Sequence, residues 1–234
     1  YEIPKRDWSS DVCSSDLLSI APLYVALGTM TVQQTLATMG RSTVPLIAAA
    51  IIADIHIDPA LVGVYLAIQS VAGFLTTVGC GGFIMRFGAM RMTQVGMAAL
   101  GLGLAAATAG WLPLFALGAF VGGLGQAIST PSSPHLLGRL SPRHLAPLVF
   151  SIKQTGVPAG LMLAGVVAPA LTLAYDWRMA LIVLSATCFL SIIALQPLRA
   201  RFDDDRNPSY PLSPADIRAN VAGVFRDRRL RALC

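Results

Sequence analysis

The chain has 234 residues, with 55% hydrophobic and only 12% charged residues, and a net charge of +5. This charged share is about half of the usual one, and the mean hydropathy is +0.66. So few charges exclude a disordered chain, a coiled coil and an ordinary soluble enzyme, and the apolar runs are long enough to cross a bilayer.

Residues 1–17 are expected to be a non-native leader. The segment Asp7–Leu17 has the sequence DWSSDVCSSDL, which resembles the translation of a sequencing adaptor. A natural polar tail is the alternative. Added segments of this kind are set aside before the fold is considered, so the native bundle is expected to begin at residue 18.

Six apolar segments follow, each long enough for a spanning helix, which needs about 20 residues. They cover residues 19–52, 60–83, 93–111, 112–136, 145–173 and 177–196. The first is too long for one straight crossing. Asp58 before Pro59 predicts an N-cap and a first-turn proline for the second. The predicted fold class is therefore all-α membrane, with six transmembrane helices in residues 18–197.

The basic residues predict the orientation of these helices. The connections after the first, third and fifth segments contain a single basic residue, Arg178, whereas the other connections and the tail are rich in arginine. Because Lys and Arg collect on the cytoplasmic side, both ends are predicted to be cytoplasmic, with the protein in the inner (plasma) membrane. Trp111 and Trp177 are then expected at the outer interface.

The tail, residues 198–234, is expected to be a cytoplasmic central loop that contains an amphipathic helix and the start of a further span. Ser213 and Asp216 give an N-terminal cap signal, and apolar residues follow on one helical face. The arginines of the tail are expected to meet anionic lipid rather than nucleic acid. Asp203–Asp205 is expected to be a solvated loop rather than a metal site.

Polar residues within the apolar segments are the candidates for a solute site, because a charge inside a membrane usually faces a cavity or a partner. Gln34 and Arg41 share a face of the first segment, Gln126 lies in the fourth, and Lys153 and Gln154 lie in the fifth. The two cations have an alternative, in which they snorkel to the headgroups. Structural hydrogen bonding is the alternative for Gln126. Two cations without a buried acid favour an anionic solute.

Small residues predict close packing between helices. Gly118 and Gly122 in the fourth segment, and Gly156 and Gly160 in the fifth, have the spacing that lets helix backbones approach. Gln69 in the second segment is one more polar residue with either a structural or a solute-binding interpretation. Close packing of this kind suits fixed helices as well as helices that slide or hinge.

The connection between the second and third segments resembles the G-x-L-x-D-R-x-G-R-R pattern of the major facilitator superfamily. Gly81, Arg86 and Gly88 match the pattern, whereas Met85 stands at the acidic position. The stretch Phe150–Pro158 is similar to the fifth segment of bacterial permeases related to cyanate and organic-anion transporters. The resemblance implies that Gly81, Arg86 and Gly88 belong to a conformational-switch loop.

The same resemblance implies the N-terminal half of a secondary transporter, built from two inverted three-helix repeats that work by alternating access. Its partners would be the lipid bilayer, a small organic solute and a C-terminal half of the same chain. Gln34, Arg41 and Gln126 would line the path, followed by Lys153 and Gln154. No metal or cofactor is implied.

Two other functions are alternatives for such a sequence. An intramembrane enzyme needs clustered catalytic groups, whereas the only glutamate is Glu2 and the histidines, His56, His135 and His144, are scattered. A membrane receptor or assembly subunit without transport is the other alternative. The chain is therefore predicted not to be an enzyme.

Overall fold

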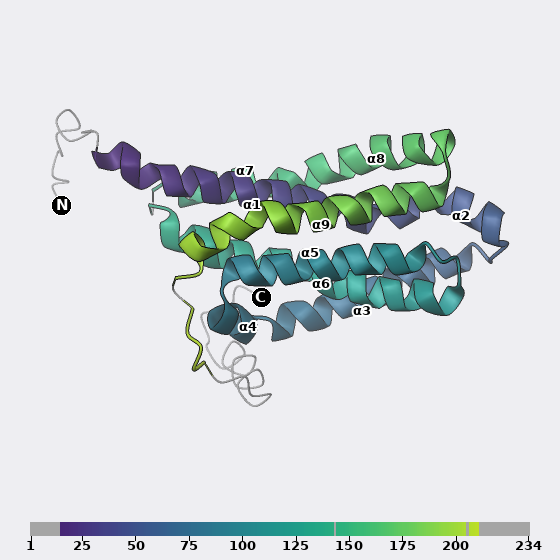
Figure 1. The fold of residues 1–234 in the computed structure, drawn as a ribbon, viewed down its shortest axis with the longest axis horizontal. Helices are drawn as coiled ribbons and strands as arrows, with labels where there is room; N and C mark the ends of the chain where they lie inside the picture. Colours follow the sequence, from purple (N-terminus) through teal and green to yellow (C-terminus); the bar gives the residue numbers. More distant parts are fainter. Residues whose placement is uncertain (1–14, 143, 205, 211–234) are drawn as a thin grey trace, which may run out of the picture.

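The computed structural model describes residues 15–142, 144–204 and 206–210, and these form a bundle of nine α-helices (Figure 1). In chain order the helices are α1 (Ser15–Leu46), α2 (Ala48–Ile55), α3 (Ala60–Gly79), α4 (Gly81–Phe87), α5 (Ala89–Ala107), α6 (Leu112–Leu140), α7 (Ala146–Gln154), α8 (Gly156–Ala174) and α9 (Trp177–Phe202). Across short breaks, α2 continues α1, α4 continues α3 and α8 continues α7, and the chain otherwise reverses direction from one helix to the next (Figure 1). The tail residues 211–234, with their predicted amphipathic helix, lie outside the described residues.

Four of the described helical stretches are long and apolar enough to cross a membrane, and the bent pair α1–α2 makes a fifth. The protein is therefore an all-α, multi-pass membrane protein. The stretch that fails this test is α5, which carries Arg91 and Gln94 but packs between α6 and α9 with most of its residues buried. A membrane helix that its neighbours shield from lipid can carry polar residues on its covered faces. The count of six spans stays a prediction.

The helix boundaries have local causes. The Asp58 carboxylate accepts the Ala60 N–H at 2.8 Å, as the predicted cap requires. The chain bends by 47° between α1 and α2, just after Pro45, which has no N–H for the helical hydrogen bond and crowds the preceding turn. The first apolar segment therefore forms a bent pair of helices rather than one straight helix.

Two helix crossings repeat each other. α3 packs against α6, and α8 packs against α1. Close approaches pair Gly123 with Gln69, Gly73 with Ala127, Gly156 with Thr31 and Gly160 with Thr35. Aligning these pairs in order sets Thr31 against Gly123 and Thr35 against Ala127, and this register sets Gln34 against Gln126. Two related three-helix units would produce such a correspondence.

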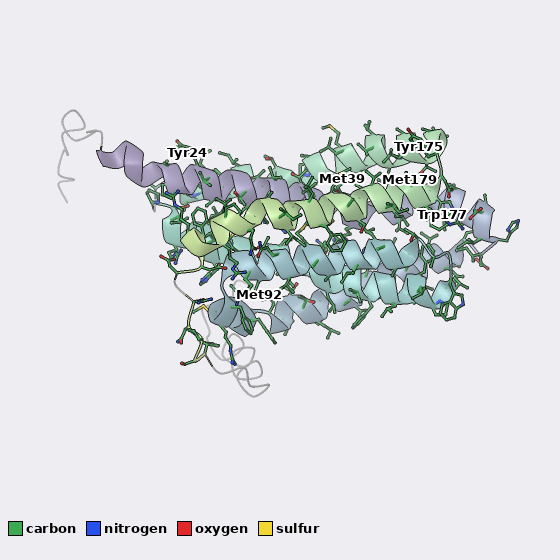
Figure 2. The ribbon with its side chains drawn as sticks, in the orientation of Figure 1. Tyr24, Met39, Met92, Tyr175, Trp177 and Met179 are labelled. Carbon is green, nitrogen blue, oxygen red and sulfur yellow. The ribbon has the colours of Figure 1, made fainter. Side chains whose placement is uncertain are left out.

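Trp177 is buried among its neighbours at one end of the bundle, which the sequence did not predict for this ring. Its side chain is only 1% exposed, against 62% for Trp111. It packs against Phe115 at 6.0 Å between ring centroids, and its Nε1–H donates to Asp54 at 3.1 Å. Trp177 lies toward the α2 end of the bundle, and Met92 toward the α4 end (Figure 2). The ring binds α9 to α2 and serves the core, because its one polar atom has a protein partner.

Candidate functional site

A buried hydrogen bond fixes the depth of α1 relative to α6. The side-chain amide of Gln33 donates to the Ser129 hydroxyl, and both residues are buried. The two helices run in opposite directions (Figure 1). The remaining amide oxygen of Gln33 has no partner among the described residues, so this region keeps a free acceptor.

Gln34 is next to this bond and also has an unsatisfied oxygen. Its side chain is 4% exposed, and its Nε2 donates to Thr38 at 3.4 Å, a long hydrogen bond. Its Oε1 has no partner in the described part of the chain. Gly156 of α8 packs against its Cβ. The amide is therefore held by packing, with its carbonyl available for another donor.

Lys153 and Gln154 are placed differently by α7. Lys153 is only 6% exposed, and no hydrogen bond or ion pair holds its ammonium within residues 15–142, 144–204 and 206–210. It lies one turn before Gly156 and thus near the stretch of α1 that carries Gln34. Gln154 is exposed and points elsewhere, so the structure does not join it to Lys153.

Arg41 lies deep along α1, fourteen residues before the end of α2, which is about 21 Å of helix. Its side chain is exposed rather than covered by neighbouring helices, and it makes no hydrogen bond or ion pair with any described residue. Arg41 lies eight residues after Gln33 on α1, and Val121 lies eight residues before Ser129 on α6. Because the two helices are antiparallel and the Gln33–Ser129 bond joins them, Arg41 and Val121 lie at a similar depth in the bundle. Gln69, whose Oε1 also lacks a described partner, packs near this depth.

Gln126 is half-buried on α6 and makes no hydrogen bond to the described chain. It corresponds to Gln34 in the repeated crossing described above. The structure thus places two equivalent amides, at Gln34 and Gln126, together with two unpartnered cations, at Arg41 and Lys153, along α1, α6 and α7. Such groups can bind an anion or a polar solute.

An apolar cavity of about 320 Å³ lies beyond Arg41, toward the α2 end. Side chains from α1–α2, α3 and α6 line it, among them Val44, Tyr65 and Phe115. Sequence reasoning missed this cavity, because its lining residues look like ordinary core residues until three helices bring them together.

The predicted switch loop contains one position, Gly88, at which the backbone conformation and the neighbouring Asp203 leave no room for a side chain. Gly81 starts α4, Arg86 lies near the ring of Phe87 at 5.7 Å, and Gly88 has φ +95°. A side chain at Gly88 would be strained by this backbone and would also overlap the carboxyl group of Asp203. The loop is therefore fitted around an acid from another helix.

Asp203 is not a solvated loop residue, which corrects the prediction for Asp203–Asp205. Its side chain is 7% exposed, and its carboxylate oxygens accept the backbone N–H groups of Met90 at 2.8 Å and Arg91 at 2.9 Å. These groups lie at the start of α5, where a negative charge is favoured by the unpaired amides and by the helix dipole. An acid thus acts at this loop even though Met85 holds the acidic position of the family pattern.

Further bonds join the same end of the bundle. Arg139 of α6 donates to the Phe202 carbonyl at 3.0 Å and pairs with Asp204 at 2.8 Å. The Asn207 N–H donates to the Met85 carbonyl at 2.9 Å. The Asp203 network, as we call these contacts together with the cap of α5, connects the ends of α4, α6 and α9 to the start of α5.

The opposite end has an ion cluster of its own. Arg178 of α9 pairs with Asp54 of α2 at 2.8 Å and with Asp176 at 3.2 Å, and its guanidinium lies 4.3 Å from the ring centroid of Trp177. Both ends of the bundle are therefore tied by charged groups that have partners.

The comparison with protein families gives one match. The family model described as Major Facilitator Superfamily matches residues 30–234. A search of curated proteins finds no match. The matched range contains all five candidate solute-binding residues and the whole switch loop.

Proposed function

The chain belongs to the major facilitator superfamily and is a membrane transporter, and we propose that it moves a small organic anion by alternating access. Members of this family are transporters rather than enzymes. In this proposal, residues 18–197 form six spans with both ends in the cytoplasm of an inner-membrane protein. Residues 198–234 form the central loop, and a second half of the same chain completes the site.

The observation that carries the proposal is the unpartnered state of Arg41 and Lys153 within the described residues. A cation inside a bilayer costs roughly 2.5–3.5 kcal/mol on insertion scales and is rarely kept without a function. Here no described carboxylate neutralises either one. An anionic solute would supply the missing charge, and the free amide groups of Gln34 and Gln126 would orient it.

The positions of the ion pairs and hydrogen bonds between helices support the proposal of alternating access. The Asp203 network joins helices at the α4 end, and the Arg178 cluster joins them at the α2 end. The candidate site is proposed to lie between them, where the Gln33–Ser129 hydrogen bond joins α1 to α6 and none of the ion pairs of the described residues lies. A carrier that opens alternately to each side needs a fixed central site and end contacts that hold each half as a unit.

The test uses the complete transporter in liposomes, with uptake of radiolabelled small carboxylates and of their neutral amides. Arg41→Ala should raise the KM for carboxylates by about 10- to 100-fold, which corresponds to one lost hydrogen bond between charged groups. Arg41→Lys should recover part of this loss. Arg201→Ala, at an exposed position near the end of α9, is the matched control and should leave KM unchanged.

Two results would contradict this function. Equal uptake of carboxylates and neutral amides would remove the anion preference. No uptake of any solute by a correctly inserted protein would favour the receptor or assembly alternative.

The topology has its own test. A Ser209→Cys variant of the complete protein, made without its native cysteines, should resist an impermeant thiol reagent in intact cells. Ser209 is exposed, so failure to label would reflect its side of the membrane rather than burial. Ready labelling in intact cells would reverse the proposed orientation.

A further inference from the structure

The cavity toward the α2 end has an apolar wall, and one of its lining residues carries a hydroxyl group. Its lining includes Val44 and Ile51 from α1–α2, Tyr65 and Ile68 from α3, and Phe115 and Ala116 from α6. Its volume is about 320 Å³, whereas a cavity of roughly 150 Å³ holds benzene. The space is therefore sufficient for a substituted ring.

Tyr65 is that residue. Its side chain is 7% exposed and packs edge-on against Phe115 with 6.3 Å between ring centroids. Its hydroxyl has no hydrogen-bond partner within the described residues. It is not among the buried polar atoms without a partner, so the oxygen is accessible. The hydroxyl can therefore donate to an acceptor atom of a ligand.

Arg41 precedes this cavity on α1 without being one of its lining residues. Val44, which does line the cavity, follows Arg41 by three residues and so lies on a neighbouring part of the same helix face. On α3, Gln69 follows Tyr65 by one turn, and its Oε1 has no partner among the described residues. A cation and an amide are therefore each within one turn of a residue of the apolar wall.

We infer that this cavity is the subsite for the apolar body of the transported anion, and that the substrate class is an aromatic carboxylate. The carboxylate binds Arg41, the ring occupies the cavity against Phe115, and the Tyr65 hydroxyl donates to a polar substituent or a carboxylate oxygen. This inference rests on the proposed anion transport, and it adds the size and hydrophobicity of the solute. A short anion such as acetate would bind Arg41 but leave the cavity unfilled.

The experiment compares two anions in the complete transporter reconstituted in liposomes. Labelled benzoate and labelled acetate are the probes, and KM is measured for each. Wild type should prefer benzoate by at least tenfold, because burying a ring removes a large apolar surface from water. Ala116→Leu, which fills the cavity, should raise the KM for benzoate by at least tenfold and leave the KM for acetate within twofold.

Two variants complete the design. Tyr65→Phe should raise the KM for 4-hydroxybenzoate by roughly 2- to 12-fold, the range expected for one neutral hydrogen bond. Ala186→Leu adds the same side chain at an exposed position on α9, away from the cavity, and should change neither KM.

The outcomes separate this inference from the function on which it rests. If Arg41→Ala impairs both anions while Ala116→Leu affects both equally or neither, anion transport stands and the aromatic subsite is overturned. The same holds if other parts of the transporter or lipid fill the cavity, since Ala116→Leu would then not discriminate between the probes. If neither anion is carried, the anion function and this inference are both overturned.

Discussion

At the α4 end of the bundle, the Asp203 carboxylate receives two backbone N–H groups, and Arg139 binds both a carbonyl and Asp204. Along α1 and α7, by contrast, Arg41 and Lys153 have no partner in the described residues. Both regions contain charged groups on apolar helices. In the first region the protein itself supplies the partner, either an opposite charge or a hydrogen-bonding group. In the second region the described chain supplies neither.

This difference separates groups that hold the structure from groups that await a ligand. A buried carboxylate with two backbone donors at a helix N-terminus is stabilised by charge-assisted hydrogen bonds and by the helix dipole. A cation on an apolar helix that has no partner in the described chain contributes no such stabilisation. Removing the first should therefore destabilise the protein, whereas removing the second should impair only binding. The predictions below test this contrast.

The largest effect is expected at Gly88, where the loop meets Asp203. Gly88→Val forces a β-branched side chain into φ +95° and against the Asp203 carboxyl group. Backbone strain of this kind costs about 1–3 kcal/mol, and displacement of the cap adds to it. The melting temperature of the purified complete transporter should fall sharply.

Gly81→Ala is the matched control for Gly88→Val, because Gly81 belongs to the same loop and a Cβ there meets nothing within 4 Å. It should leave the melting temperature nearly unchanged. Equal losses in the two variants would mean that the family pattern, rather than the contact with Asp203, sets the requirement for glycine.

Asp203→Asn should have the next largest effect on stability. It keeps the size of the side chain but removes the charge that two N–H groups bind at the start of α5. A loss of about 1.5–3 kcal/mol in the free energy of unfolding is expected for this change, measured by denaturant unfolding in detergent.

The neighbouring Asp204→Asn is the control for Asp203→Asn. Asp204 pairs with Arg139, but its side chain is 68% exposed, and exposed pairs contribute at most about 1 kcal/mol. A loss for Asp204→Asn as large as that for Asp203→Asn would show that the ion pair, and not the cap of α5, holds this end together.

Lys153→Met tests the other side of the contrast. The substitution keeps most of the side-chain volume and removes the unpartnered ammonium, so the free energy of unfolding should stay the same or rise. Anion uptake should nevertheless weaken by about tenfold, because one charged donor is lost. Unfolding in detergent and uptake in liposomes are measured on the same preparation. A clear loss of stability would reveal a structural partner for Lys153 and place it with Asp203.

The sequence predicted the features that depend on composition and local pattern. The all-α membrane class follows from apolar runs, whereas the bend after Pro45 was not predicted from the length of the first segment. The cap of α5 did not follow, because Asp203 and Met90 are 113 residues apart in the chain and nothing in one sequence pairs them. The burial of Trp177 was missed for the same reason, since an amphipathic ring suits an interface until Asp54 supplies its acceptor.

The candidate site was predicted in its residues but not in its arrangement. Arg41, Lys153 and Gln34 stand out because polar groups are rare in apolar runs. The chamber beyond Arg41 did not stand out, because Tyr65 and Phe115 fit any hydrophobic core. Gln154 lies apart from Lys153, since neighbouring residues on a helix point about 100° away from each other.

The smallest effect is expected from the two amides that the repeated crossing makes equivalent. If Gln34 and Gln126 both orient the solute, Gln34→Ala and Gln126→Ala should each raise KM by roughly 2- to 12-fold, the range for one neutral hydrogen bond. Their structural surroundings differ, because Gln34 is packed against Gly156 whereas Gln126 is half-buried. Similar KM effects with a larger loss of stability for Gln34→Ala would support a shared role in binding. A KM effect in only one of the two variants would show that the two amides correspond in position but not in function. The solute site would then lie closer to the residue whose substitution changes KM.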